Sequence, residues 1–427
     1  MNKIEVQKTG LTVYEEILDN GLTVFVVPKK DVNNIYVTIT TDFGSNTIEF
    51  VPNGKSDFVK VPLGIAHFLE HKMFEQEDGT DAFAFFGARG SDANANTNNF
   101  KTTYLFSGPH FFQDNMNFLL DYVQSPYFTE RNVEKEKGII IQEMKMYEDD
   151  PYSKLYDTIL DCVFTEQPMK YPVIGTGDSV NSITKDDLYD CYNTFYHPTN
   201  MHVVVTGNVE AEEVINLIKE NQKKKNFPNA KKIQIKEYNE PDEVETKKKV
   251  ITANITLPKV SIAYKINLDK IKNIPIRKKL LYLSILFDAK FGVTSLVNEE
   301  MRNEKILTEG IDVSAVNCDT HILYVLMGET NEEKKFLDKV QKEMKDLAIT
   351  ESELERKKKT LVSSLIYKSD SIMSINHKIT NDFLRYKKVI DNNYEEIKSL
   401  NYEEFKKFVN ELDVSNYSIV VEEKQGG

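Results

Sequence analysis

The feature that most constrains the fold of this chain is a faint internal repeat, in which one order of elements occurs twice. Ser182-Ile-Thr-Lys-Asp-Asp-Leu188 precedes an apolar run at 202–206, and Ser399-Leu-Asn-Tyr-Glu-Glu-Phe405 precedes a second apolar run at 417–421. Each copy therefore joins a helix start with paired acids to a short strand, as duplicated supersecondary units do. The repeat predicts two homologous halves.

Residues 219–249, between the two copies, are typical of a linker, because they are rich in Lys, Asn, Glu and Asp and contain prolines. Elsewhere, runs rich in Val, Ile and Thr at 22–27 and 35–40 predict strands, and apolar residues three and four apart at 132–147 predict a helix. We expect an α+β protein with an N-terminal half at 1–220, a linker at 221–244 and a C-terminal half at 245–427.

The sequence His67-Phe-Leu-Glu-His71 is the strongest chemical signal. On a helix, residues four apart share a face, so both imidazoles can reach one metal ion, and Glu70 can reach a water molecule beside them. Apolar Ile65, Phe68 and Leu69 would bury the other faces. Chance placement of two core or surface histidines is the alternative. The motif, which reverses the thermolysin order, predicts a zinc site with Glu70 as the base.

A catalytic zinc needs a third protein ligand and an open position for water. In the helix predicted at 132–147, Glu136 and Glu143 lie two turns apart on a stripe that also carries Ile140 and Tyr147. Carboxylates on a partly buried stripe need a cation or hydrogen-bond donors. The residues themselves leave the choice between Glu143 and Glu136 open.

Bulk properties exclude several other functions. The net charge of -13, without a separate basic stretch, argues against nucleic acid or an anionic membrane surface as a partner. Three widely spaced cysteines suit buried free thiols in a reducing compartment. We expect no signal peptide and no membrane-spanning helix, and therefore a cytoplasmic protein.

Taken in order, these motifs resemble the M16 peptidase family, which includes insulysin, pitrilysin and the mitochondrial processing peptidase. The resemblance covers nearly the whole chain and is strongest with the bacterial YfmH-like branch, whose pattern is similar to His71-Lys-Met-Phe-Glu75. The segments that carry it are Gly64–His71, Asn94–Thr97 before Tyr104–Phe106, Glu136 and Glu143, Asp149–Pro151, and Phe195–Met201.

The resemblance implies a fold in which each half is an antiparallel sheet backed by helices, the two halves facing one another across a cleft. It implies His67, His71 and Glu143 as ligands of one zinc ion per chain. Glu136 would support them, and the family pairs substrate backbone along the strand that matches Asn94 and Ala95.

The second half departs from the family pattern at one position. Arg302 matches an arginine that approaches the substrate carbonyl in active members, but Glu309 stands where the family has a tyrosine. An ionised carboxylate cannot donate a hydrogen bond in place of a phenol. The second half also has no arrangement of His and Glu like that of the first, so we expect only one half to bind metal.

We therefore expect a zinc metalloendopeptidase that cleaves peptides or processes a protein, paired with a homologous M16-like chain or with a second copy of itself. The alternative is a non-catalytic or weakly active subunit of a heterodimer, used for binding or assembly. A maturation peptidase dedicated to one modified peptide or protein is a further alternative, suggested by the branch that the chain resembles.

Overall fold

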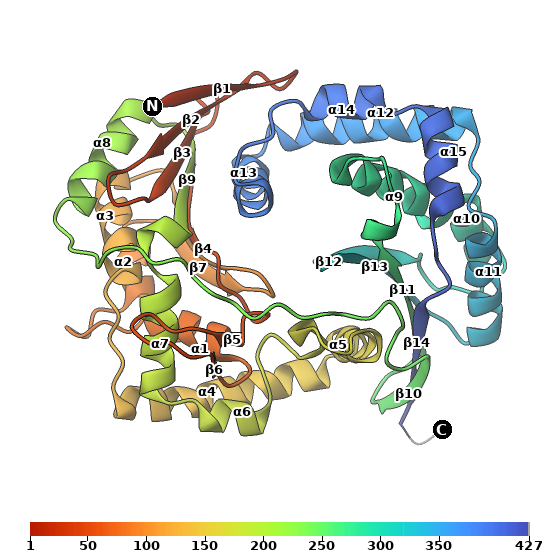
Figure 1. Ribbon diagram of the computed structural model, residues 1–427, viewed down its shortest axis with the longest axis horizontal. Coiled ribbons are helices and arrows are strands. Elements are labelled where there is room, and N and C mark those ends of the chain that lie inside the picture. Colours follow the sequence, from red (N-terminus) through yellow and green to blue (C-terminus); the bar gives the residue numbers. More distant parts are fainter. Residues whose placement is uncertain (319, 426–427) are drawn as a thin grey trace. The chain divides into compact units, whose positions relative to one another are not determined.

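The computed structural model describes residues 1–318 and 320–425. The chain forms two compact units (Figure 1). The first unit consists of Met1–Met144, Pro172–Glu237 and Leu365–Asn393, and the second of Lys145–Tyr171, Tyr238–Ser364 and Tyr394–Gly427. Both units contain sheets and helices, so the expected α+β class is confirmed.

A sheet of seven strands, in the order β1-β2-β3-β9-β4-β8-β7, forms the centre of the first unit. All neighbouring strands are antiparallel except β3 and β9, which are parallel. The strands are β1 (Asn2–Val6), β2 (Leu11–Ile17), β3 (Thr23–Pro28), β4 (Ile35–Thr41), β7 (Asp92–Thr97), β8 (Thr102–Gly108) and β9 (Met201–Gly207). A short pair, β5 (Glu49–Phe50) and β6 (Val59–Lys60), lies outside this sheet.

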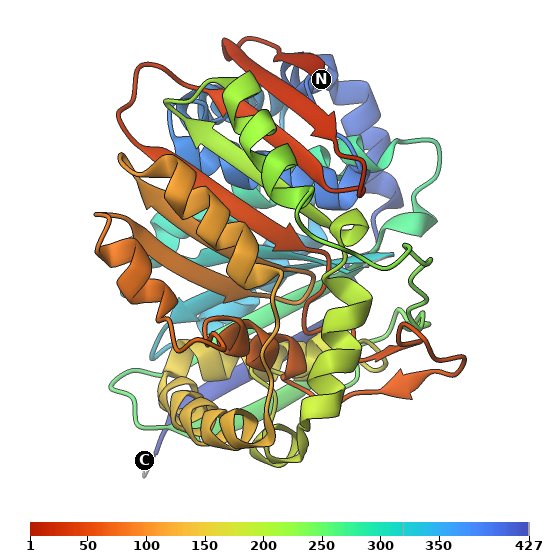
Figure 2. The same cartoon turned by 90° about the vertical axis from the view of Figure 1, so that its left-hand side faces the viewer.

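Helices cover this sheet. Figure 2 shows α3 (Phe112–Val123) and α8 (Ala211–Gln222) lying across its strands, where α3 packs on β8 and α8 on β3. The other helices of the unit are α1 (Ile65–Met73), α2 (Ala82–Gly87), most of α4 (Glu130–Asp149), α6 (Gly177–Ser182), α7 (Lys185–Phe195) and α13 (Ile372–Tyr386).

The second unit repeats this strand order. Its five-stranded sheet runs β10-β14-β11-β13-β12, with β10 parallel to β14 and the other pairs antiparallel. The first unit has the same succession in β3-β9-β4-β8-β7. The strands are β10 (Lys248–Ala253), β11 (Lys259–Asn267), β12 (Asp312–Cys318), β13 (His321–Glu329) and β14 (Tyr417–Lys424). This correspondence, with β9 and β14 in matching places, confirms the predicted repeat.

Both faces of the second sheet are buried. On one face, α5 (Pro151–Val163) contributes Leu155 and Ile159 to a cluster with Ala263 of β11. On the other, α9 (Ile276–Phe291) packs Leu283 and Leu286 into a larger cluster. The remaining helices are α10 (Leu296–Asn303), α11 (Glu333–Lys345), α12 (Glu351–Lys368), α14 (Asn393–Ser399) and α15 (Tyr402–Glu411).

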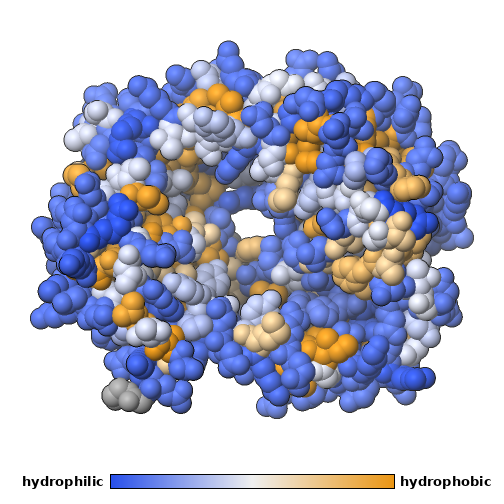
Figure 3. Space-filling view, turned by 180° about the vertical axis from the view of Figure 1, so that it is seen from behind, coloured by the Kyte–Doolittle hydropathy of each residue, from blue (hydrophilic) through white to orange (hydrophobic). Residues whose placement is uncertain are grey.

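One helical stretch among the described residues, Ile276–Asn303, is long and apolar enough to cross a membrane by length and composition alone. The core helix of a soluble protein passes the same test, and 56% of its most apolar window is buried. Packing of α9 inside the second unit accounts for this apolar character. The molecular face seen in Figure 3 is mostly hydrophilic, with scattered hydrophobic patches.

Neither unit is a single continuous stretch of the chain, which differs from the predicted halves at 1–220 and 245–427. Residues 145–171, including α5, belong to the second unit, and residues 365–393, including α13, belong to the first. The physical reason is packing: α13 buries Ile375 and Ile379 with Phe25 of β3, and α5 buries its apolar face in the second unit.

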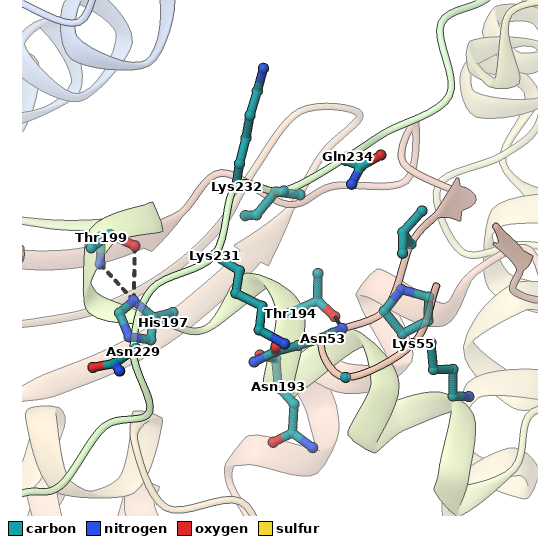
Figure 4. A pocket seen from close by; sticks show the side chains of 14 residues that line it. Asn53, Lys55, Asn193, Thr194, His197, Thr199, Asn229, Lys231, Lys232 and Gln234 are labelled. Carbon is teal, nitrogen blue, oxygen red and sulfur yellow. Dashed lines mark hydrogen bonds between the residues drawn. The ribbon is translucent and has the colours of Figure 1, made fainter. Parts of the chain in front are cut away.

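Much of the predicted linker is irregular. Its residues up to 237 belong to the first unit, and residues 238–244 belong to the second. A cavity of 80 Å³ lies between residues 51–55, the end of α7 and residues 229–234 (Figure 4). Beside it, His197 Nε2 donates to the Pro228 carbonyl at 2.9 Å, and Nδ1 accepts from the Thr199 amide at 3.2 Å. His197 is thus hydrogen-bonded at both ring nitrogens.

Candidate metal centre

The helix α1 presents the two histidines of the motif. It begins after Gly64, whose φ of 85° is left-handed and whose missing side chain lets the Ile174 carbonyl approach, since a Cβ would lie 2.3 Å from that oxygen. Ile65, Phe68 and Leu69 are buried, as the sequence predicts. The rings of His67 and His71 lie side by side, with centroids 4.6 Å apart.

The helix α4 brings a carboxylate to the same place. Glu143 Oε1 lies 3.7 Å from His67 Nε2, and Glu143 Oε2 lies 3.4 Å from His71 Nε2. One ligand atom from each of the three residues lies within 4.8 Å of the others. Within residues 1–318 and 320–425, this is the one group of at least three such side chains that could hold a metal ion.

Glu136, two turns before Glu143, has a different place. Its Oε1 lies 3.1 Å from His71 Nδ1, on the side of the ring away from Glu143, and its Oε2 lies 3.5 Å from Lys72 Nζ. Burial alone would raise the pKa of the Glu136 carboxyl, but the hydrogen bond from His71 and the charge of Lys72 lower it overall. Glu136 therefore contacts His71 at Nδ1, the ring nitrogen that does not face Glu143.

Glu70 is buried beside the two histidines, with 7% of its surface exposed. The Thr97 hydroxyl of β7 donates to Glu70 Oε2 at 2.5 Å. Burial raises the pKa of Glu70, and the hydrogen bond from Thr97 offsets part of that rise. A carboxyl with a raised pKa suits a group that must both take and release a proton near neutral pH.

The two imidazoles differ in their electrostatics. Burial, followed by the nearby charge of His71, lowers the pKa of His67 to about 3, so its ring is neutral and keeps a lone pair for a metal. Burial would lower the pKa of His71 as well, but Glu136 outweighs it and raises that pKa. Among the described residues, buried His67 Nδ1 has no hydrogen-bond partner.

Asn94 and Ala95 lie on β7, the last strand of the first unit's sheet. Exposed and half-buried side chains alternate along this strand, and β7 pairs with β8 on one side. Among the described residues, no strand pairs with its other edge. Because Thr97 is the last residue of this strand, β7 ends next to Glu70.

Arg302 and Glu309 belong to the second unit, whereas the cluster lies wholly in the first. Arg302 is exposed in the last turn of α10, and Glu309 is exposed between α10 and β12. The structure therefore unites His67, Glu70, His71, Glu136 and Glu143, and it places β7 beside them.

Two residues at the cluster were given no role from the sequence. Thr97 stands in the Asn94–Thr97 motif, but only the fold shows that its hydroxyl reaches Glu70. Lys72 is buried against Glu136. In the sequence, the one local indication of its burial is its place in a helix between His71 and apolar Met73.

The fold and this cluster define an α+β protein of two similar units with a candidate metal site in the first. Residues 60–177 match the description "Insulinase (Peptidase family M16)" and residues 182–361 match "Peptidase M16 inactive domain". The chain belongs to the M16 peptidase family.

Individual proteins are similar to this chain in sequence or in fold. The chain is 42% identical over 306 residues to YmfH of Bacillus subtilis, described as an uncharacterized zinc protease, covering 72% of this chain and 71% of that one. The crystal structure of an M16-like peptidase from Alicyclobacillus acidocaldarius is 28% identical with a TM-score of 0.90, covering 97% of this chain and 99% of that one. The periplasmic protease PqqL of Escherichia coli, 16% identical with a TM-score of 0.73, matches 100% of this chain with 48% of its own.

Proposed function

We propose that this protein is a zinc-dependent endopeptidase. The observation that carries the proposal is the convergence of His67 Nε2, His71 Nε2 and the Glu143 carboxylate, with Glu70 buried beside them. Relatives described as zinc proteases support it.

The donor set fits zinc. Two imidazole nitrogens and one carboxylate leave a fourth position open, which is the pattern of catalytic zinc sites. Ligand atoms about 2.0 to 2.1 Å from a tetrahedral zinc are about 3.3 Å apart. The distances of 3.4 and 3.7 Å between the Nε2 atoms and the oxygens of Glu143 are close to this spacing. The side chains of His67, His71 and Glu143 are 12%, 25% and 27% exposed, so solvent can reach the site.

The residues around the ligands have separate tasks. Zinc held by His67, His71 and Glu143 would polarise a carbonyl and make a water molecule more acidic. Glu70, oriented by Thr97, accepts a proton from water and returns it to the leaving nitrogen of the peptide. Glu136 holds the orientation of the His71 ring.

The substrate is an extended peptide that adds to the free edge of β7. Backbone groups of Asn94 and Ala95 would pair with it, because an edge strand offers unpaired amides and carbonyls to any extended chain. Recognition through the backbone tolerates many sequences, so this edge favours breadth of substrates.

A second M16-like chain, different or identical, completes the enzyme. The chain corresponds to 48% of PqqL, which supports pairing of two such chains. Glu309 cannot donate to the developing oxyanion while it is ionised, so we assign that role to the partner, with Arg302 as this chain's own contribution.

Metal analysis combined with a peptide-library assay tests the proposal. We expect one zinc per chain and cleavage that is lost in Glu70→Gln, a variant that keeps the metal because the amide preserves shape while removing the base. Bound zinc without cleavage, alone or with a homologous partner, would instead favour the non-catalytic subunit. Glu309, which stands where the family has a tyrosine, is the residue that suggests this alternative.

A further inference from the structure

Lys72 follows His71 on α1 and is wholly buried, with 0% of its surface exposed. Lysine is almost never fully buried without a partner, because an ammonium group that leaves water loses its hydration. The proposed chemistry gives this side chain no task, so its contacts indicate its role.

The ammonium group of Lys72 lies between two carboxylates. It forms an ion pair with Glu75, just beyond the end of α1, and its Nζ lies 3.5 Å from Glu136 Oε2 on α4. The other oxygen of Glu136 lies 3.1 Å from His71 Nδ1. Glu136 is therefore held at both oxygens, by the imidazole at one and by the lysine at the other.

This double contact limits how the His71 ring can turn. With Oε2 held by Lys72, Oε1 remains on Nδ1, and the opposite ring nitrogen, Nε2, remains directed toward Glu143 at 3.4 Å. Hydrogen-bond partners behind a metal-binding histidine fix its tautomer and orientation in this way. A carboxylate freed at one oxygen could rotate, and the ring would lose that constraint.

We infer that Lys72 is a positioning residue for the proposed zinc site, acting through Glu136 on the orientation of His71. The inference rests on the proposed function. Its geometric basis is the continuous chain of contacts from Lys72 to Glu136, to His71 and to Glu143.

Two other roles for Lys72 lead to different results. A lysine that acted only as a nearby charge would repel a cation, so its removal would raise zinc affinity. A lysine that served only as an ion pair with Glu75 would lower stability when removed and leave zinc affinity unchanged. Of the three roles, only a positioning role predicts that removal of the Lys72 side chain lowers the zinc affinity.

Zinc dissociation constants of the full chain, measured by competition with a chromophoric chelator, separate these roles. We expect Lys72→Met to weaken zinc binding about tenfold, the lower end of what loss of such an outer partner costs. Unchanged or tighter binding would overturn the inference. Lys72→Leu, which also removes both the donor and the charge, replaces Lys72→Met with the same expected loss if circular dichroism shows that the latter does not fold.

Combining Lys72→Met with Glu136→Gln tests the route. If Lys72 acts through Glu136, adding Lys72→Met to Glu136→Gln should change the zinc affinity by no more than about twofold. A tenfold loss that persists in this background would overturn the inference. Glu75→Gln is the matched control, because it removes the lysine's other partner and leaves Glu136, so zinc affinity should stay within about twofold of wild type.

The wild-type chain distinguishes this inference from the proposed function. No zinc binding by the wild type would refute the proposed function itself. Zinc binding that depends on His71 but is the same in Lys72→Met would refute the inference alone.

Discussion

Glu136 and Glu143 lie seven residues apart on α4, and their different positions, rather than their residue type, give them different contacts at this site. Glu143 faces Nε2 of both histidines, whereas Glu136 faces Nδ1 of His71 alone. The sequence left the choice of ligand open, because both side chains lie on one stripe. The geometry favours Glu143 as ligand, in agreement with the family resemblance.

Zinc affinity of single variants checks this division. We expect Glu136→Gln to weaken zinc binding by about 10- to 100-fold and Glu143→Gln by more than about 100-fold, because a lost ligand costs more than a lost outer partner. His71→Ala should abolish binding. The ligand choice would be reversed if Glu136→Gln released the metal and Glu143→Gln retained it.

His202 provides a pH-dependent prediction away from the site. It is fully buried on β9, and burial, with the charges of Lys101 and Lys387, lowers its pKa to about 3. Between pH 6.5 and 3 the unfolded chain binds a proton at this residue that the folded chain does not. The free energy of unfolding therefore falls as pH falls, by about 1.4 kcal/mol per pH unit from this group.

His202→Leu removes that proton binding. We expect the wild type to lose about 2 kcal/mol more stability than His202→Leu between pH 6.5 and 5, measured by urea unfolding at each pH. If the free energy of unfolding falls by the same amount in both proteins over this pH range, His202 is not the source of the pH dependence.

At the scale of elements, local pattern predicted most pieces and little of their packing. Apolar spacing gave the helix that became α4 within two residues at each end, and β-branched runs gave β3 and β4. The sequence did not indicate that α13 would pack on β9 and β4, since the apolar face of a helix does not specify which sheet it will cover. The hydroxyl of Thr97 on Glu70 and the contact of Lys72 with Glu136 join separate elements, so they too required the fold.

Asn376 tests how α13 is attached to the first sheet. It is fully buried, accepts from the Thr38 hydroxyl at 2.8 Å and donates to the Val204 carbonyl at 2.9 Å. Asn376→Ala should lower the free energy of unfolding by about 2 kcal/mol, because the buried partners are left unsatisfied.

Denaturant unfolding of Asn376→Ala measures this loss. Met373→Ala, an exposed position on the same helix, is the control and should change stability by less than about 0.5 kcal/mol. Equal effects at the two positions would contradict the attachment.

At the scale of the whole molecule, the two units share a strand succession but differ in the candidate metal site. The second sheet has the same strand succession as five strands of the first, but among the described residues the group that could hold a metal ion occurs in the first unit only. The sequence predicted this asymmetry from the single histidine motif. Family descriptions that match the two parts of the chain differ in the same sense, since the second is called inactive.

Activity is expected to depend on a partner. With Glu309 unable to donate while ionised, the isolated chain should cleave peptides slowly, and adding a homologous M16-like chain should increase kcat. Each oxyanion donor that the partner supplies is worth about 2.7 to 4 kcal/mol, or roughly 100- to 1000-fold. Full activity in a monodisperse monomer, unchanged by the partner, would show that this chain builds its site alone.

The discontinuous units predict which fragments fold. A fragment 1–237 lacks α13, which supplies Ile375 and Ile379 to the core around Phe25, so it should unfold with little cooperativity and bind zinc weakly. Adding residues 365–393 in trans or by fusion should restore a cooperative transition and zinc binding near one per chain. A fusion with the same residues in scrambled order is the matched control. Cooperative unfolding and full zinc binding by 1–237 alone would show that the first unit does not need its late helix.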